Sequence, residues 1–395
     1  MRCDTPKKQF GGPNRTSASG AIISLHPLGE FVFVIHSDLT VCTYKLHHSR
    51  GSAPFHFKID RARVLEGKDA SFSKHVRLGE ATEANELELS GAIDDGICFQ
   101  RNVSFAISLG VSPKSVGAVN AASDPSHLLM SCGYFDNNIK THSLDSLQLQ
   151  NSVDGGHRGH ITCLEVDDEG EVMVTGGVDA TCHIWIIDHD YLALAITDGF
   201  VKSSPGREVL EDSNCHHAHT LFGHVTAVNS VAICTKLDVA ISGAEGGSIC
   251  IHNIRSGKFL RSLHIDATTK KVQESCGSNG AIPVKKLAIH VDGYFVAHLA
   301  DGSLYVISIN GEQVCKTHIG EHLNAMIICS QSNTVVTGGS MGCAKVWKLN
   351  DLSLQCTVDV KKHGSITSLA FTHESEFLCI GSSNGLLSIV SRLAE

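Results

Sequence analysis

One pattern of apolar and polar positions recurs along the chain, and its clearest copy spans residues 159–185. An apolar stretch at 159–166 is followed by a polar turn and by a second apolar stretch at 172–177. A tight turn at Asp179 then leads into the alternating stretch 181–185, which ends in a tryptophan. Stretches that are rich in β-branched residues and bounded by turn residues predict β-strands, and alternation predicts a strand with two different faces. The pattern therefore predicts consecutive strands joined by tight turns.

The turn position held by Asp179 has further copies, and their spacing gives the period of the repeat. Seven residues occupy this position in order along the chain: Asp38, Asp136, Asp179, Gly246, Asp301, Met341 and Asn384. Successive copies are 98, 43, 67, 55, 40 and 43 residues apart. The short steps match the period of about 40–45 residues of WD40 repeats, each of which supplies four strands. The longer steps predict insertions, and the first copy is the weakest of the seven.

Seven four-stranded units predict an all-β fold, namely a seven-bladed WD40-type β-propeller with long inter-blade insertions. Each unit has two apolar faces that it cannot bury alone, and radial packing covers both faces while leaving only short edges. An open sandwich lacks such a period, and a helical repeat would need apolar positions every ~3.6 residues. We expect a single domain over residues 1–395. Its blades are expected near 18–46, 99–149, 157–189, 219–262, 281–312, 319–357 and 362–391, with insertions at 47–98, 190–218 and 263–280.

The last predicted blade lacks an outer strand, because only residues 392–395 follow the apolar stretch 386–391. Propellers commonly close by combining strands from both ends of the chain in one blade. We therefore expect residues 5–16 to supply the missing strand.

Polar residues also recur at fixed places in the repeat. His160, Thr175, Asp179 and Trp185 could be interpreted as a catalytic relay. A structural role is favoured, because in the WD40 proteins that the repeat resembles such residues form a hydrogen-bonded chain inside one blade. A buried polar network of this kind stabilises the fold when every member is paired. We therefore expect the blade that contains Asp179 to be the stiffest.

Other repeats keep only fragments of this set. His224 and Ser242 recur in one repeat, where Gly246 replaces the aspartate. Trp347 recurs in another, where Met341 lacks the carboxylate. The expected structural network comprises His160, Thr175, Asp179, Trp185, His224, Ser242, Asp136, Asp301 and Trp347.

Charge and composition narrow the class of partner and compartment. The formal net charge is −9 and no run of lysine or arginine is present, which argues against a nucleic-acid partner because phosphate contacts need a basic surface. The 15 cysteines are odd in number and many lie in apolar stretches, so we expect free thiols in a reducing compartment. The first residues lack the apolar core of a signal peptide, and no stretch approaches the ~18 apolar residues of a membrane span. We expect a cytoplasmic protein.

Candidate chemistry is sparse. The run Cys215-His216-His217-Ala218-His219 offers metal-ligating side chains but lacks the paired spacing of a zinc site, so a polar loop is favoured and we expect no metal. The chain has no Gly-rich phosphate loop, no G-x-S-x-G elbow and no H-E-x-x-H motif. We expect no cofactor and no catalysis. The acidic segments 66–97 and 198–214, each either a flexible loop or an ordered docking element, are better candidates for partner recognition.

Several short motifs, taken in order, resemble one known family. They are Ser-Cys-Gly-Tyr-Phe-Asp-Asn-Asn at 131–138, His-Thr-Leu-Phe-Gly-His at 219–224, Ile-Ser-Gly at 241–243 and Leu-Tyr-Val-Ile-Ser-Ile-Asn-Gly at 304–311. Together they cover roughly residues 20–390 and are similar to the C-terminal WD40 region of BEACH-domain proteins of the neurobeachin type. The BEACH and PH-like domains that normally precede this region are missing, so we expect a C-terminal piece of a larger polypeptide or a shortened product.

The resemblance implies a function. Its members are large cytosolic scaffolds at vesicle and endomembrane surfaces, in trafficking or autophagy. We expect a non-catalytic scaffold that binds other proteins and reaches membranes only peripherally, through partners or through the missing upstream domains. The alternative is a WD40 substrate receptor of a ubiquitin ligase complex.

Overall fold

The structure, a computed structural model, is all β in the residues that it describes. These are residues 20–28, 31–37, 40–47, 56–64, 104–108, 128–133, 136–143, 149–187, 215–265, 272–273, 281–360, 364–372 and 377–391. They contain 28 strands, and the one helix among them is a short 3-10 helix at Thr235–Leu237. The strands form seven sheets. The expected fold class, a seven-bladed all-β propeller, is confirmed, and each sheet is one blade.

Contacts within the chain divide it into two compact units. The first unit consists of Met1–Leu65, Ser73–Ala81 and His264–Glu395, and the second consists of Glu66–Phe72 and Thr82–Leu263. Four sheets belong to the first unit and three to the second. The border between the units falls between Leu263 and His264, inside the outer strand of the last sheet of the second unit.

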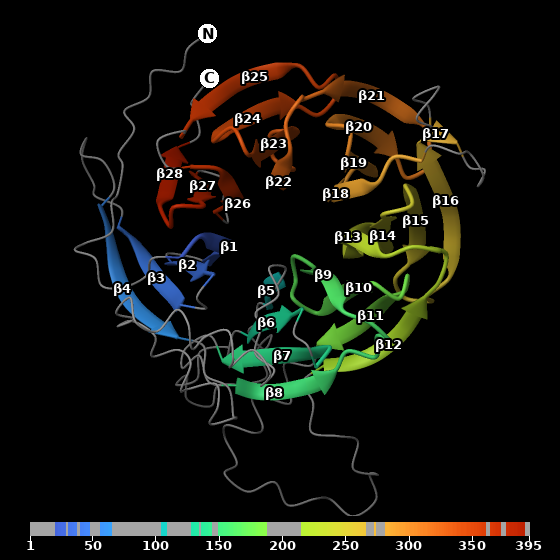
Figure 1. Ribbon diagram of the computed structural model, residues 1–395, viewed down its shortest axis with the longest axis horizontal. Helices are drawn as coiled ribbons and strands as arrows, with labels where there is room; N and C mark the ends of the chain where they lie inside the picture. Colours follow the sequence, from blue (N-terminus) through green and yellow to red (C-terminus); the bar gives the residue numbers. More distant parts are fainter. Residues whose placement is uncertain are drawn as a thin grey trace, which may run out of the picture. The chain divides into compact units, whose positions relative to one another are not determined.

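The second unit holds the sheets formed by β5 to β16, and in each sheet the strands pair antiparallel in chain order (Figure 1). One sheet comprises β5 (Ser104–Ser108), β6 (Leu128–Cys132), β7 (Asn138–Ser143) and β8 (Leu149–Asp154). The next comprises β9 (Ile161–Val166), β10 (Val172–Gly177), β11 (Cys182–Ile187) and β12 (Cys215–Leu221). The third comprises β13 (Val228–Cys234), β14 (Val239–Ala244), β15 (Ser248–Asn253) and β16 (Phe259–Ile265), and the two-residue strand β17 (Val272–Gln273) pairs with the end of β16.

The first unit holds the remaining four sheets, with the same chain-order pairing. One comprises β1 (Ile22–Leu28), β2 (Phe31–His36), β3 (Thr40–His47) and β4 (His56–Val64). Two more comprise β18 (Val284–His290), β19 (Tyr294–Leu299), β20 (Ser303–Ser308) and β21 (Gln313–His318), and β22 (Leu323–Cys329), β23 (Thr334–Gly339), β24 (Cys343–Lys348) and β25 (Leu354–Asp359). The last comprises β26 (Ile366–Phe371), β27 (Phe377–Ser382) and β28 (Leu387–Ser391).

Within each unit, neighbouring sheets meet through their first strands and bury the faces between them. In the second unit β9 contacts both β5 and β13, and in the first unit β22 contacts β18 and β26, while β26 contacts β1. Apolar clusters lie between neighbouring sheets rather than within one. One cluster joins Met130 and Ile139 to Ile161 and Trp185, all at most 2% exposed. Burial of apolar area contributes about 25 cal/mol per Å², so these shared faces are the main stabilising contacts of each unit.

A side chain near the start of several first strands binds the main chain of the next first strand. The hydroxyl of Thr162 in β9 donates to the carbonyl of Val228 in β13. The hydroxyl of Thr367 in β26 donates to the carbonyl of Ile22 in β1. We call these contacts the first-strand clasps. They fix how far and at what register one sheet lies from the next.

A third first-strand clasp joins β22 to β26. The side-chain amide of Asn324 donates to the carbonyl of Ile366 over 2.8 Å. Asn324, Thr162 and Thr367 are each the second residue of their strand, so the same position serves in three sheets.

Several expected boundaries differ in the structure. The segment 47–98 is not all insertion, because β4 lies within it and pairs with β3. The run 215–219, expected to be a polar loop, begins the outer strand β12, which pairs with β11 along its whole length. The β26–β28 sheet has three strands among the described residues. Asp38 and the expected closing strand at 5–16 lie outside the described residues.

Two further observations concern cysteines and membranes. The twelve cysteines in the described part of the chain form no disulfides, and most are buried in strands. Where the structure describes the chain, no helix combines the length and the hydropathy that crossing a membrane requires.

The first-strand clasps can be tested with Thr367→Val, which keeps the shape of the side chain and removes its hydroxyl. The carbonyl of the fully buried Ile22 would lose its donor, and an unpaired buried acceptor costs about 1–3 kcal/mol. We expect a lower denaturant midpoint in chemical unfolding. Thr357→Val on the exposed side of β25 is the control and should leave the midpoint unchanged. Equal midpoints for the two variants would contradict a stabilising role of the clasp.

Candidate functional site

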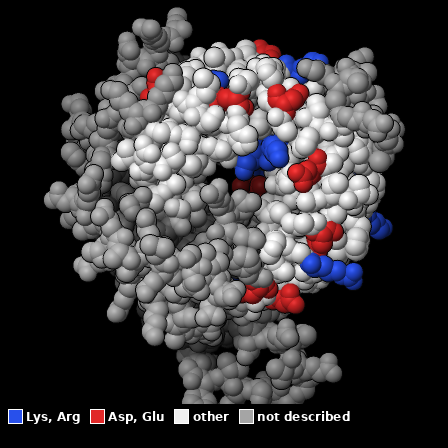
Figure 2. All heavy atoms as spheres, in the orientation of Figure 1, with Lys and Arg blue, Asp and Glu red and all other residues white. Residues whose placement is uncertain are grey.

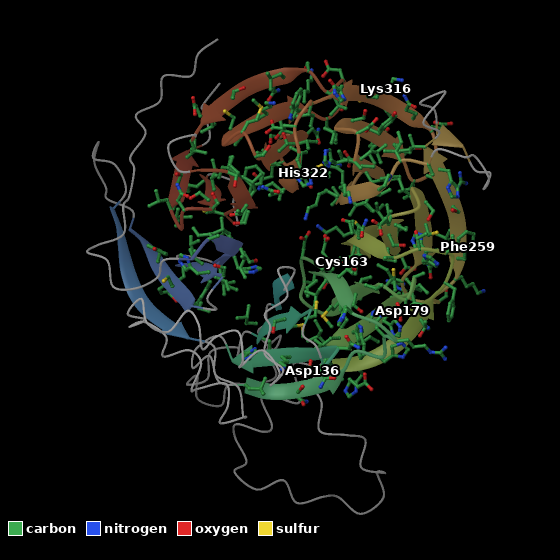
Figure 3. All side chains as sticks on the ribbon, in the orientation of Figure 1. Asp136, Cys163, Asp179, Phe259, Lys316 and His322 are labelled. Atoms are coloured by element: carbon green, nitrogen blue, oxygen red, sulfur yellow. The ribbon has the colours of Figure 1, made fainter. Side chains whose placement is uncertain are left out.

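A chain of four hydrogen-bonded side chains runs through the β9–β12 sheet. The indole Nε1 of Trp185 donates to Oγ1 of Thr175 over 3.1 Å. Oγ1 of Thr175 lies 3.0 Å from Nε2 of His157, and Nδ1 of His157 lies 3.0 Å from Oδ1 of Asp179. Thr175 is completely buried and the side chain of Asp179 is 12% exposed. The chain thus runs from the core to the loop end of the sheet, where Figure 3 labels Asp179.

The local backbone accounts for this arrangement. Asp179 lies in the turn between β10 and β11, and its carboxylate also accepts from the amides of Arg158 and Thr181. The loop that carries His157 crosses directly over Gly177, where an added Cβ would lie 2.5 Å from Nδ1 of His157. Only glycine leaves room for the imidazole at that point. The carboxylate therefore joins the loop before β9 to the turn after β10.

The histidine of this network is His157 and not His160, which corrects the expectation from the sequence. Both histidines follow a glycine, so residue type alone does not distinguish them. His160 instead places its Nδ1 3.2 Å from Oδ1 of Asn137, in the neighbouring sheet. It directly precedes β9, and the partners of Thr175 are His157 and Trp185. The number of residues before the first strand could have identified His157. His157 and His224 each lie four positions before a first strand, β9 and β13.

The β13–β16 sheet keeps part of the network with different partners. Nε2 of His224 lies 2.8 Å from Oγ of Ser242, as expected. Its Nδ1 lies 2.6 Å from Oγ of Ser248, which takes the place of the missing carboxylate at Gly246. His252 stands where the other sheet has tryptophan and donates from Nε2 to the carbonyl of Phe222 over 2.9 Å.

The β22–β25 sheet replaces the histidine and aspartate by an ion pair. Nε1 of Trp347 donates to Oγ1 of Thr337 over 2.8 Å. No sequence signal pointed to Glu321, whose carboxylate is 2.6 Å from Nζ of Lys345 and accepts from the amide of Met341. The Glu321 side chain is 2% exposed. Its carboxylate holds the turn to the loop before β22, as Asp179 does before β9.

The other two expected network residues make local contacts. Asp136 accepts from the amide of Asn138 and pairs with Lys140 over 3.0 Å. Asp301 accepts from the amide and hydroxyl of Ser303 over 2.9 and 3.0 Å. Both carboxylates shape their own turn, so the structure does not bring them into the network of His157.

Burial controls the protonation of the histidines around this network. It lowers the pKa of His183 to about 4, and the neighbouring rings of His157 and His217 lower it further. Burial also lowers the pKa of His157, although the bond to Asp179 opposes that change. Burial raises the pKa of Asp179, but the hydrogen bonds from His157, Arg158 and Thr181 outweigh it and hold the pKa below its usual value. At neutral pH the imidazoles are neutral and the carboxylate is charged.

The loop between β12 and β13 displays two large apolar side chains on a fixed backbone. Phe222 is 68% exposed and Val225 is 87% exposed. The backbone beside them is held by the bond from His252 to the carbonyl of Phe222 and by two bonds that join Thr226 and Ala227 to the β14–β15 turn. The two hydrogen bonds of His224, to Ser242 and Ser248, also hold this loop. The loop therefore presents its apolar side chains without freedom to turn them inward.

A third apolar side chain lies against the same loop. Phe259, labelled on the outer strand β16 in Figure 3, is half exposed. A Cβ added at Gly223 would lie 3.2 Å from the Phe259 ring, and φ at Gly223 is +150°, so glycine allows the close approach. We call Phe222, Val225 and Phe259 the Phe222 patch. Figure 2 shows that charged side chains on the drawn face are few and scattered among uncharged residues.

Comparisons with known proteins agree with this fold. A family model described as the neurobeachin beta propeller domain matches residues 92–393. BEACH domain-containing protein B of Arabidopsis thaliana is 27% identical over 272 residues, and BEACH domain-containing protein lvsE of Dictyostelium discoideum is 21% identical over 276 residues. These alignments cover 67% and 66% of this chain but only 10% and 11% of the relatives. The chain thus spans about a tenth of the length of these relatives.

Solved structures show the same fold. The WD40 beta propeller domain of Doa1 superimposes with a TM-score of 0.58 at 15% identity, covering 98% of this chain and 96% of that one. The computationally designed Ika8 protein gives a TM-score of 0.54 at 18% identity, covering 95% of this chain and 97% of that one. At these identities the likeness concerns the fold alone.

The network in the β9–β12 sheet predicts which histidine matters for stability. Removing a partner of a buried hydrogen bond costs about 1–3 kcal/mol, so His157→Ala and Asp179→Ala should each lower the melting temperature clearly. His160→Ala, which removes a histidine three positions away, is the matched control and should lower it less. Calorimetric unfolding of the three variants measures the difference, and an equal effect of His157→Ala and His160→Ala would contradict the assignment.

The buried His183 predicts a pH dependence of stability. Its pKa of about 4 in the folded chain lies below the 6.5 of an exposed histidine, so the unfolded chain binds more protons between these values. Stability should therefore fall as the pH drops from 6.5 towards 4, by at most about 1.4 kcal/mol per pH unit for this group. His183→Gln should flatten that slope in urea unfolding. His216→Gln, at an exposed position of β12, should not, and identical slopes for wild type and His183→Gln would disprove the prediction.

Proposed function

The chain belongs to the neurobeachin β-propeller domain family, and from this membership we propose that it works as a non-catalytic protein-interaction platform in membrane trafficking or autophagy. WD40 propellers generally bind other proteins, through loops carried on a rigid scaffold. The relatives are BEACH domain-containing proteins. That relationship supports our proposal of a cytoplasmic location at endomembrane surfaces, with contact to the membrane made by partners or by other domains of a longer polypeptide.

The observation that carries the proposal is the Phe222 patch. Aromatic and large aliphatic side chains in the centre of an interface contribute most of its binding energy. Isolated exposed apolar residues are common, but here two lie on one fixed loop and a third lies against the backbone of that loop, a grouping that favours an interaction site. The described contacts of this loop keep its backbone in place before a partner arrives.

Rigidity of the loop favours binding in a second way. Ordering a flexible loop on association costs free energy, typically about 0.5–1.5 kcal/mol for each side chain that is immobilised. The hydrogen bonds of His224 and His252 already order the loop backbone in the folded chain, so this part of the cost does not arise on binding. The patch therefore suits a partner that presents a complementary apolar surface.

The polar network supports a structural rather than a catalytic assignment. Both ring nitrogens of His157 are engaged, one by Asp179 and the other by Thr175. The hydroxyl of Thr175 is completely buried and also accepts from Trp185. A nucleophile must be reachable by substrate, and a base needs a free nitrogen to receive a proton. The network meets neither requirement.

The proposal is tested with the double variant Phe222→Ser, Val225→Ser. We expect quantitative affinity purification from cytosolic extract to recover trafficking proteins with the wild-type chain and to lose them, at least about tenfold, with the double variant. The control is Val314→Ser, Leu354→Ser, which removes two half-exposed apolar side chains from β21 and β25. It should retain the partners. Equal recovery by both double variants would exclude the patch, and recovery of ubiquitin ligase adaptors instead of trafficking proteins would overturn the proposed role.

A further inference from the structure

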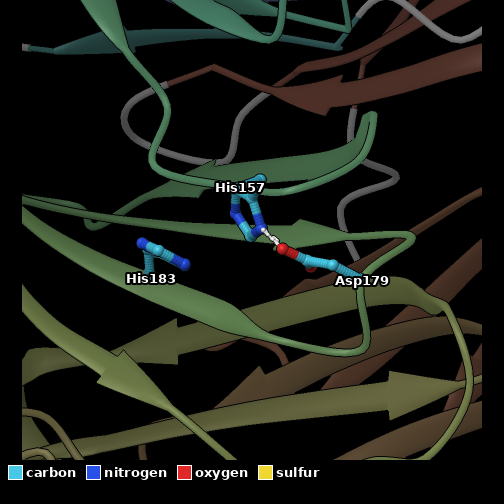
Figure 4. A group of neighbouring side chains, drawn as sticks. All are labelled: His157, Asp179 and His183. Atoms are coloured by element: carbon cyan, nitrogen blue, oxygen red, sulfur yellow. Dashed lines mark hydrogen bonds and ion pairs between the residues drawn. The ribbon is translucent and has the colours of Figure 1, made fainter.

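A fifth polar side chain, His183, lies against the network of the β9–β12 sheet without belonging to it. It is on β11, directly opposite Thr175 in the strand register, and its ring centroid is 4.1 Å from that of His157. Figure 4 shows His157, Asp179 and His183 converging from a loop, a turn and a strand. One ligand-type atom from each lies within 4.8 Å of the other two. Among the residues that the structure describes, this is the one such group.

His183 is poorly paired for a buried group. The residue is 5% exposed and its Nδ1 has no hydrogen-bond partner. Its Nε2 has one long contact, 3.3 Å to Oγ1 of Thr181. A buried polar atom without a partner is uncommon in folded proteins and calls for an explanation.

Thr181 marks the centre of the group. Its Oγ1 is 2.8 Å from Oδ1 of Asp179, 3.2 Å from Nδ1 of His157 and 3.3 Å from Nε2 of His183. The hydroxyl donates its one proton to Asp179, and its lone pairs can accept from an imidazole N–H. Three donor atoms that surround one oxygen at this spacing resemble the ligand set of a small cation.

We propose that His157, Asp179 and His183 bind a divalent first-row transition metal ion, with zinc as the expected ion and the Thr181 hydroxyl or a water as fourth ligand. Two imidazoles and one carboxylate are a ligand set that zinc accepts in tetrahedral geometry. Metal–ligand distances of about 2.0–2.2 Å place such ligands about 3.4 Å apart. The pair His157 Nδ1 and Asp179 Oδ1 is already at 3.0 Å, and all three ligand atoms lie within 4.8 Å of one another, so the site is completed when His183 moves towards this pair.

The protonation states suit a metal. Asp179 accepts hydrogen bonds from His157, Arg158 and Thr181, as an ionised carboxylate does, and the other ring nitrogen of His157 faces the Thr175 hydroxyl. Neutral imidazole and carboxylate are the forms that coordinate. In the hydrogen-bonded network Nδ1 of His157 carries the proton and donates to Asp179. Coordination through Nδ1 moves that proton to Nε2, which then donates to Thr175, so the ring loses no proton overall.

Among the described residues no other sheet brings three such side chains together, which makes the site specific to one blade. In the β13–β16 sheet the positions of Asp179, Thr181 and His183 are held by Gly246, Ser248 and Cys250. In the β22–β25 sheet the positions of Asp179 and His183 are held by Met341 and Lys345, and a lysine beside a buried carboxylate already neutralises it. The partly exposed Asp179 gives the metal a route from solvent.

Exposed histidines nearby require a matched control. His216 and His219 lie on the outer strand β12, outside the group, and surface histidines bind zinc weakly. Full-length chain freed of metal by a chelator is titrated with Zn²⁺ in competition with a chromophoric chelator. We expect one tight equivalent, a higher melting temperature on binding, and with Co²⁺ the intense visible absorption of a tetrahedral complex.

His183→Gln separates the proposal from its rivals, because it leaves the chain from Trp185 to Asp179 intact. Loss of an outer partner of a ligand typically weakens binding about 10–100-fold, so loss of a direct ligand should weaken it at least as much. The double variant His216→Ala, His219→Ala should bind as the wild type does. Unchanged affinity in His183→Gln, or loss of binding only in the β12 double variant, would overturn the proposal. If His183→Gln does not fold, a pale octahedral Co²⁺ spectrum of the wild-type chain would overturn it equally.

Discussion

Each sheet of this protein has two apolar faces, and the need to cover both is the constraint from which the rest of the structure follows. Within each unit a sheet meets its neighbours through its first strand, and large side chains such as Met130 and Trp185 fill the space between. Burial of apolar area does not fix how neighbouring sheets are aligned, and the hydrogen bonds of the first-strand clasps do. Because the faces are fully occupied, variation is confined to the ends of the strands, where the turns and loops lie.

The polar residues at those ends perform one task with several chemistries. In the β9–β12 sheet a histidine and an aspartate join the incoming loop to the turn. In the β13–β16 sheet a histidine and a serine do so. In the β22–β25 sheet Glu321 in the loop accepts from the amide of Met341 in the turn and pairs with Lys345 of β24. The purpose common to all three is to fix a loop on a sheet. One of these fixed loops carries the Phe222 patch, so the structural network and the proposed interaction site are parts of one arrangement.

Much of the fold could be predicted from the sequence, because turn residues recur at a period that strand packing imposes. The period gave the number of blades, and the motifs at 131–138 and 219–224 gave the family, which the match over residues 92–393 confirms. The choice between His157 and His160 could not be made from residue type, since both follow a glycine. The choice depended on where the loop before β9 places each side chain, and that is set by the fold of the loop.

Other features of the site carry no local signature at all. Glu321 resembles any polar loop residue in the sequence, and its burial beside Lys345 appears only when the loop is folded over the sheet. Phe222 resembles a core residue, and its exposure results from the hydrogen bonds of His224 and His252 that hold the backbone with the ring outside. His183 lies opposite Thr175 through strand register, and its closeness to Asp179 depends on the turn.

The first-strand clasps are chemically one-sided. The donor is a side chain, Thr162, Asn324 or Thr367, but the acceptor is in every case a main-chain carbonyl. Every amino acid has a carbonyl, so mutations in the accepting strand leave the joint intact. A blade that is duplicated or transferred during evolution therefore brings its own half of the joint and finds the other half in any neighbour. The side chains of adjacent blades can diverge without breaking the bonds that hold their backbones together.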